Sequence, residues 1–68
     1  MKTKKLILEI LEDKSELESS AIMREMEERG RSISYDTLSR NLRSMAEEGL
    51  LIREAKGKPW NYYYQLNK

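Results

Sequence analysis

The 68 residues are enough for one small domain, and a domain of this size buries only about 60% of the surface that its unfolded chain exposes. Hydrophobic residues make up 38% of the chain, and the net charge is only +1. The low net charge and the periodic spacing of the apolar residues argue against intrinsic disorder. Cysteine and histidine are absent, which excludes disulfides, cysteine-based zinc sites and thiol or histidine catalysis. No apolar run is long enough for a signal peptide or a membrane span. We therefore expect a cytoplasmic protein.

Charge is distributed unevenly along the chain. Residues 1–30 carry six Lys and Arg against eight Asp and Glu, a net charge of −2. Residues 31–68 carry seven against four, a net charge of +3. A positive half beside a negative half suggests a surface that faces a polyanion and a solvated back. Simple mixing of charges is the alternative.

The first predicted element is a helix over residues 4–14, with Thr3 as a possible cap. Its buried face is formed by Leu6, Ile7, Ile10 and Leu11. Leu8 lies well off that face. In a small domain it is either covered by another element or available to a partner.

A second helix is predicted to begin just before Ile22, with Ser19 or Ser20 as its cap. The pattern breaks before it, so Leu17 is assigned to a short extended piece. The buried residues of this helix are expected to be Ile22, Met23 and Met26. The helix should run to Arg29 and end at Gly30.

The third predicted helix covers residues 34–48 and is the most informative segment. Ser34 is a candidate N-cap, and Asp36 in the first turn suits the positive end of the helix dipole. Leu38, Leu42 and Met45 recur at helical spacing and form a buried stripe. Gly49 then supplies a left-handed stop, with Leu50 placed to fold back against the last turn.

The side of this helix opposite the stripe is rich in cations and hydroxyls. It presents Asp36, Arg40, Arg43, Ser44 and Glu47, with Thr37 and Ser39 on its flanks. Arginine can pair bidentately with guanine, and Ser or Thr can bind phosphate or a base edge. These residue types near a helix N-terminus favour insertion into a DNA groove.

After Gly49 the period changes from helical to alternating. Residues 50–55 and 60–66 are predicted strands, joined by a basic turn at residues 56–59. Tyr62, Tyr64 and Leu66 share one face of the second strand, and Tyr63 lies on the other. Pro59 would disrupt a central strand, so the pair is expected to be an edge hairpin or a loop margin.

The sequence resembles a winged helix-turn-helix DNA-binding domain. The segments that carry the resemblance are SYDTLSRNLR at residues 34–43, EEGLL at residues 47–51 and YQL at residues 64–66. They are similar to a capped recognition helix, a Gly-Leu exit into the first wing strand, and an aromatic-x-Leu return strand. The resemblance implies an α+β, mostly α fold of three helices with a C-terminal β-hairpin wing. It covers residues 1–68 as a single domain, and no sensor or effector domain is expected to follow.

The resemblance also implies a function, sequence-specific binding of double-stranded DNA by a small transcriptional regulator. The helix at residues 34–48 would enter the major groove. Its DNA-binding residues would be Ser34, Tyr35, Thr37, Ser39, Arg40, Arg43 and Ser44. Backbone anchors would be Arg31 and Arg53, with Lys56 and Lys58 at the wing tip.

A homodimer on a palindromic site is expected, because one small module usually binds specifically only weakly. Leu8, or Trp60 with Tyr63, would supply the dimer contact. The main alternative is a winged-helix module that binds protein and not DNA. RNA binding, with Tyr63 and Trp60 as stacking platforms, is a third possibility. The sequence shows no pocket-forming acid–base pair, phosphate loop or metal motif, so no enzyme activity, metal or cofactor is expected.

Overall fold

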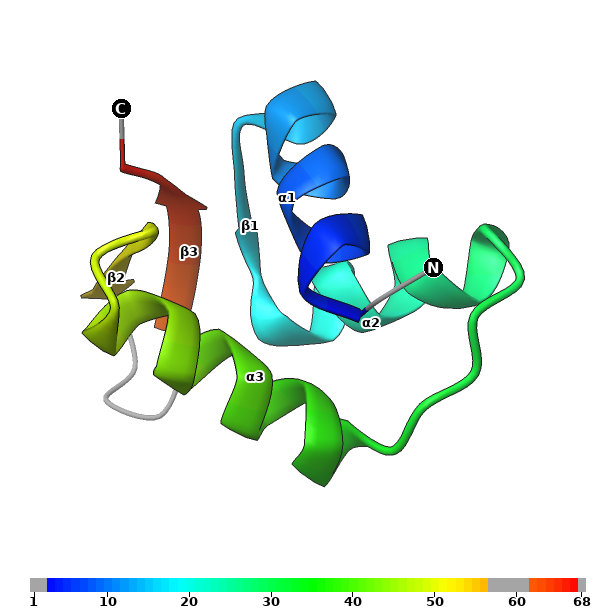
Figure 1. Ribbon diagram of the computed structural model, residues 1–68. Coiled ribbons are helices and arrows are strands. Elements are labelled where there is room, and N and C mark those ends of the chain that lie inside the picture. Colours follow the sequence, from blue (N-terminus) through cyan, green and yellow to red (C-terminus); the bar gives the residue numbers. More distant parts are fainter. Residues whose placement is uncertain (1–2, 57–61, 68) are drawn as a thin grey trace.

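The computed structural model describes residues 3–56 and 62–67 as three helices and a small sheet (Figure 1). The elements in chain order are α1 (Thr3–Lys14), β1 (Glu16–Glu18), α2 (Ser19–Glu28), α3 (Tyr35–Glu47), β2 (Leu51–Ala55) and β3 (Tyr62–Leu66). In Figure 1, α3 runs along the bottom of the molecule, below α1 and α2, and the sheet stands beside them. The predicted three helices and hairpin are confirmed.

One core joins all three helices and the sheet. Its buried hydrophobic residues are Leu6, Ile7, Ile10, Leu11, Ile22, Met26, Leu38, Leu42, Met45, Leu51 and Tyr64. The stripes predicted for the first and third helices are therefore confirmed. In the second helix Met23 is only half-buried. Leu8 is also half-buried and packs against the core, so it is partly covered by the fold.

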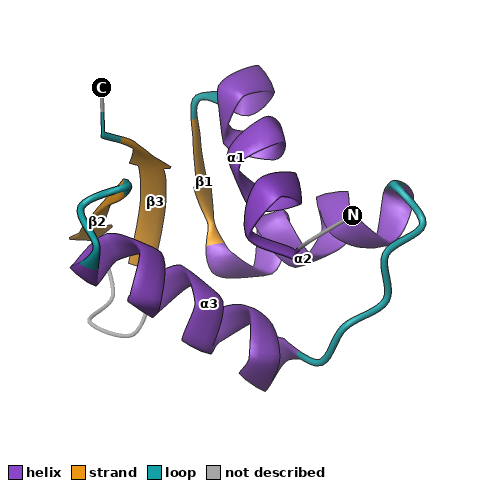
Figure 2. Cartoon of the chain, in the orientation of Figure 1, coloured by secondary structure: helices purple, strands orange, loops and turns teal. Residues whose placement is uncertain are grey.

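The sheet has three strands in the order β1-β3-β2, and both pairings are antiparallel (Figure 2). Tyr64 in the middle of β3 lies opposite Leu17 on β1 and Arg53 on β2. The expectation of an edge hairpin is thus wrong for its second strand. β3 is central because the short extended piece around Leu17 pairs with its free edge. Pro59, on which that expectation rested, lies outside the described residues.

The start of α2 also differs from the prediction. The helix begins at Ser19, and Glu18 occupies the N-cap position without a side-chain cap hydrogen bond. Ser20 instead donates its hydroxyl hydrogen bond to the Glu18 carboxylate, at 3.2 Å. Neither Ser19 nor Ser20 is the cap, because β1 continues to Glu18 and leads directly into the helix.

Glycines end α2 and α3 in the same way. Gly30 and Gly49 have φ angles of +83° and +84°. Glycine adopts this conformation without a steric clash because it has no Cβ. After each glycine the chain folds back, so that the Leu50 amide donates to the Met45 carbonyl at 2.9 Å. The equivalent bond after α2 runs from the Arg31 amide to the Met26 carbonyl at 2.8 Å. Both ends are Schellman motifs, as the glycine positions predicted.

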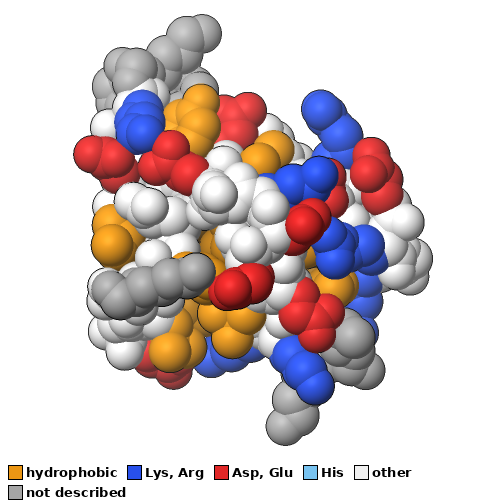
Figure 3. All heavy atoms as spheres, turned by 90° about the horizontal axis from the view of Figure 1, so that it is seen from above, with side chains coloured by type: hydrophobic (Ala, Val, Ile, Leu, Met, Phe, Trp, Pro, Cys, Tyr) orange, Lys and Arg blue, Asp and Glu red, His pale blue; other side chains and the backbone are white. Residues whose placement is uncertain are grey.

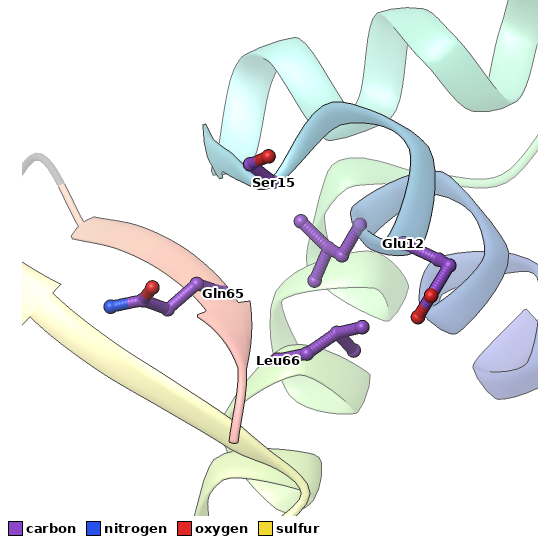
Figure 4. A pocket seen from close by; sticks show the side chains of 5 residues that line it. Glu12, Ser15, Gln65 and Leu66 are labelled. Carbon is purple, nitrogen blue, oxygen red and sulfur yellow. The ribbon is translucent and has the colours of Figure 1, made fainter. Parts of the chain in front are cut away.

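α1 ends in a left-handed residue that is not glycine. Ser15 has a φ angle of +73°, and its amide donates to the Leu11 carbonyl at 2.9 Å. Ser15 lines a cavity of about 180 Å³ with Leu11, Glu12, Gln65 and Leu66 (Figure 4). A left-handed conformation costs a residue with a Cβ about 1–2 kcal/mol, so the backbone here is strained.

Replacing Ser15 by glycine is expected to raise the free energy of unfolding by about 0.5–1 kcal/mol. The gain is smaller than the strain because glycine also has more conformational freedom to lose in the unfolded chain. Urea denaturation followed by circular dichroism measures the change. Ser15→Ala is the matched control, since it removes the hydroxyl and keeps the Cβ. Equal stabilisation by both variants would show that the strain is not the cause.

Candidate nucleic-acid interface

The N-terminus of α3 is fixed by two hydroxyl side chains. The Ser34 hydroxyl oxygen accepts a hydrogen bond from the Thr37 amide at 3.1 Å and donates one to the Thr37 hydroxyl at 2.9 Å. The predicted cap is therefore confirmed. Both residues are exposed, and each hydroxyl still has a free acceptor lone pair or proton for another partner.

α3 separates its apolar and polar residues cleanly. Leu38, Leu42 and Met45 are 0% exposed, while Arg40 and Arg43 are exposed. Ser39 and Ser44 are half-buried beside the arginines. Tyr35, a candidate DNA contact in the first turn of α3, has half of its surface in solvent. One side of α3 thus combines two exposed arginines with several hydroxyls.

Asp36 holds Arg40 in an ion pair along α3. The Arg40 Nη2 lies 3.2 Å from the Asp36 Oδ2, at i and i+4 spacing, and both side chains are largely exposed. An exposed pair of this kind contributes only about 0.3–0.5 kcal/mol. The guanidinium can therefore leave the carboxylate for a phosphate or a base at little cost.

A second cationic group lies where the sheet meets α3. The guanidinium of Arg53 stacks 4.5 Å above the Tyr62 ring centre. Burial raises the pKa of the Tyr64 phenol, while a hydrogen bond from Arg53 and the positive charges of Arg53 and Arg43 oppose that rise. Arg53 on β2 and Arg43 on α3 therefore both act on the Tyr64 hydroxyl. α3 contacts β2 directly, so the two arginines lie on neighbouring elements.

The remaining predicted contacts are placed differently. Arg31 is half-buried and donates a hydrogen bond to the Thr3 hydroxyl at 3.0 Å, so it ties the turn before α3 to α1. Lys56 is paired with Glu16 and Glu54. Lys58, Gly57 and Trp60 lie outside the described residues.

Cations away from α3 are mixed with carboxylates. Figure 3, which looks down on the molecule from the top of Figure 1, shows Lys and Arg side chains interspersed with Asp and Glu. Arg29 lies 3.7 Å from both Asp13 and Glu25, and Lys14 lies 4.0 Å from Glu25. These charges compensate one another.

The sequence did not indicate that Tyr62 and Tyr64 support Arg53. Alternation placed both tyrosines on the packed face of β3, which the structure confirms for Tyr64, with 3% of its surface exposed. The missing information was the register. The pairing of Arg53 with Tyr64 across the two strands brings the guanidinium over the neighbouring Tyr62 ring.

Three helices, a three-stranded antiparallel sheet and an exposed face of α3 define a winged helix-turn-helix domain of the transcription-regulator class. The chain belongs to the ferric uptake regulator family, whose model matches residues 2–68. Its structure is similar to one described as the complex structure of hsRosR-S1, with a TM-score of 0.80 and 26% sequence identity. That match covers 97% of this chain and 59% of the other. A search of curated protein sequences finds no match.

The family name refers to iron, and the residues present do not fit an iron site in this part of the molecule. The sequence contains neither histidine nor cysteine, the nitrogen and sulfur donors that transition metals most often use. Within residues 3–56 and 62–67, no group of three or more Asp and Glu side chains is arranged to hold a metal ion. The same residues include no helix with the length and apolar character needed to span a bilayer.

Proposed function

We propose that the chain binds double-stranded DNA sequence-specifically, with α3 in the major groove. The observation that carries the proposal is that α3 presents two exposed arginines, Arg40 and Arg43, and contacts the strand β2, which carries the exposed Arg53. Arg40 and Arg43 are assigned to base edges or phosphates, because an arginine fork matches both guanine and phosphate. The membership of the chain in the ferric uptake regulator family supports this assignment.

The other candidate residues surround these arginines. Ser34, Tyr35, Thr37, Ser39 and Ser44 lie on or beside the same part of α3 and offer hydroxyls to phosphates or bases. Arg53 is assigned to the DNA backbone, because stacking on Tyr62 holds its guanidinium in place before DNA arrives. Arg31 is assigned a phosphate contact next to its bond with Thr3.

The experiment that tests this function is fluorescence anisotropy with mixed-sequence duplex DNA over a salt series. Each phosphate neutralised in duplex DNA contributes about −0.9 to the slope of log affinity against log salt, so four arginines give about −3.5. Micromolar binding with a slope near that value is expected. Single-stranded RNA serves as the competitor. Displacement of the duplex by RNA at equal concentration, or no binding at low salt, would contradict the proposal.

The proposed working form is a cytoplasmic homodimer on a palindromic site, with no catalytic activity of its own. Tyr63 is half-buried and remains a candidate dimer contact. Leu8 has less surface available for a dimer contact, because it packs partly against the core. Sedimentation with and without DNA checks the dimer, and a strict monomer in both would contradict it.

A protein-binding module is the second candidate function. It is favoured by the exposure of Leu50 and Ile52, of which 43% and 42% lie in solvent, and by the net charge of only +1. Leu50 directly precedes β2, and Ile52 is its second residue. Binding of a protein partner that survives loss of Arg40 and Arg43 would identify this function.

A further inference from the structure

Lys56 follows β2 and lies on the sheet face that is turned away from the core. Side chains alternate along a strand, and directly opposed residues share a face. Leu51 is buried while Ile52 is exposed, and Ile52 lies opposite Gln65, which lies opposite Glu16. The outer face of the sheet is therefore formed by Glu16, Glu18, Ile52, Glu54, Tyr63 and Gln65. Arg53 is on the opposite face.

The Lys56 ammonium contacts a residue from each of the three strands. Its Nζ lies 2.7 Å from the Glu16 Oε1 on β1 and 3.7 Å from the Glu54 Oε1 on β2. It also lies 5.4 Å above the ring centre of Tyr63 on β3. The hydrogen bond to Glu16 raises the pKa of Lys56 above its ordinary value. The side chain thus crosses the central strand and joins β2 to β1.

The ion pair between Lys56 and Glu16 has a structural role, because β1 is short. It has only three residues, Glu16–Glu18, and runs directly into α2. A contact between Lys56 and Glu16 fixes the β2–β3 hairpin to the start of α2, and so to the helices that hold α3. A phosphate contact by Lys56 would require it to leave two carboxylates that already compensate its charge.

We propose that Lys56 is a positioning residue, which with Glu16 clasps the hairpin so that Arg53 faces the DNA, and that Lys56 itself does not contact phosphate. The inference rests on the proposed DNA binding. It separates two roles among cations that are close together in sequence. Arg53 would contact the DNA backbone, and Lys56 would hold the strand that carries Arg53.

Three variants test the proposal by anisotropy over a salt series: Lys56→Met, Glu16→Gln and the control Glu18→Gln. Glu18 is on the same strand and face as Glu16, and its carboxylate accepts a hydrogen bond from the Ser20 hydroxyl. We expect Lys56→Met and Glu16→Gln each to weaken DNA binding about two- to fivefold. The double variant should be no weaker than either, and the salt slope should stay unchanged. Glu18→Gln should not weaken binding.

A phosphate contact by Lys56 gives the opposite pattern. Glu16→Gln would then free the ammonium and strengthen binding, and Lys56→Met would reduce the magnitude of the salt slope by about 0.9. Either result would overturn the proposal. Amide hydrogen exchange without DNA tests the clasp independently. Exchange in β1 and β3 should accelerate in Lys56→Met and Glu16→Gln, and not in Glu18→Gln. If wild-type protein binds no DNA while exchange accelerates in this way, the proposed function fails and the clasp stands.

Discussion

Replacing Arg40 and Arg43 together by alanine is expected to lower the affinity for double-stranded DNA about 100-fold or more. Both guanidinium groups are exposed on the side of α3 opposite its buried stripe. A good bidentate contact between a side chain and a base contributes about 1–3 kcal/mol, so two contacts contribute about 2–6 kcal/mol together, a range that includes this factor. If the arginines contact phosphates, the salt slope should also fall by about 1.8 in magnitude. Anisotropy titrations at several salt concentrations measure both quantities.

Arg29→Ala is the matched control for this double variant. It removes the same type of side chain, but Arg29 lies within 4 Å of Asp13 and Glu25, which already compensate its charge. We expect its DNA affinity to stay within about threefold of wild type. Circular dichroism must show that every variant is folded. If the double variant is folded and binds DNA as tightly as the wild type, the role given to α3 is refuted.

Replacing Leu42 by alanine is expected to lower the free energy of unfolding by about 3 kcal/mol. Leu42 is in the middle of α3 and has 0% of its surface exposed, among buried residues from all three helices. Removing a buried leucine side chain costs about 2–5 kcal/mol, because the cavity collapses only partly. A core of this size supplies roughly 3–5 kcal/mol of net stability. A large unfolded fraction at 25 °C should therefore result.

Urea denaturation of Leu42→Ala is compared with that of Leu50→Ala. Leu50 follows the end of α3, and 43% of it is exposed, so the same change should cost less than about 1 kcal/mol. Equal losses for the two variants would mean that α3 is not packed as the structure shows. The comparison also guards the DNA experiments, since an unfolded variant cannot report on a contact.

The sequence was sufficient for features that depend on neighbouring residues. Helical spacing located the buried stripes of α1 and α3, because those stripes face one core. Ser34, Gly30 and Gly49 marked helix ends through local backbone chemistry, and the structure confirms each of them. The predicted cap of α2 was wrong for a related reason. Ser19 and Ser20 offered equivalent local choices, and the strand at Glu16–Glu18 excluded both of them as the cap.

Features that depend on distant pairing could not be read from the sequence. Residues 16–18 are too few to show an alternating pattern, so nothing indicated that they pair with β3. The contacts of Lys56 with Glu16 and of Arg53 with Tyr62 follow from that same sheet register. From its neighbours in sequence, Lys56 was a basic turn residue and a candidate DNA contact at the wing tip. The assignment of the candidate DNA contacts stays a prediction.

The central place of β3 has a consequence for how the chain folds. β3 is the last of the described strands in sequence and hydrogen-bonds to both others, so β1 and β2 have no sheet partner until it arrives. The pairing of Glu16 with Gln65 closes a loop that contains α2, α3 and β2. Such distant pairings are slow, because the entropy of loop closure is lost before the contact forms. During synthesis the three helices emerge before β3, so the surface that carries Arg53 is completed after them.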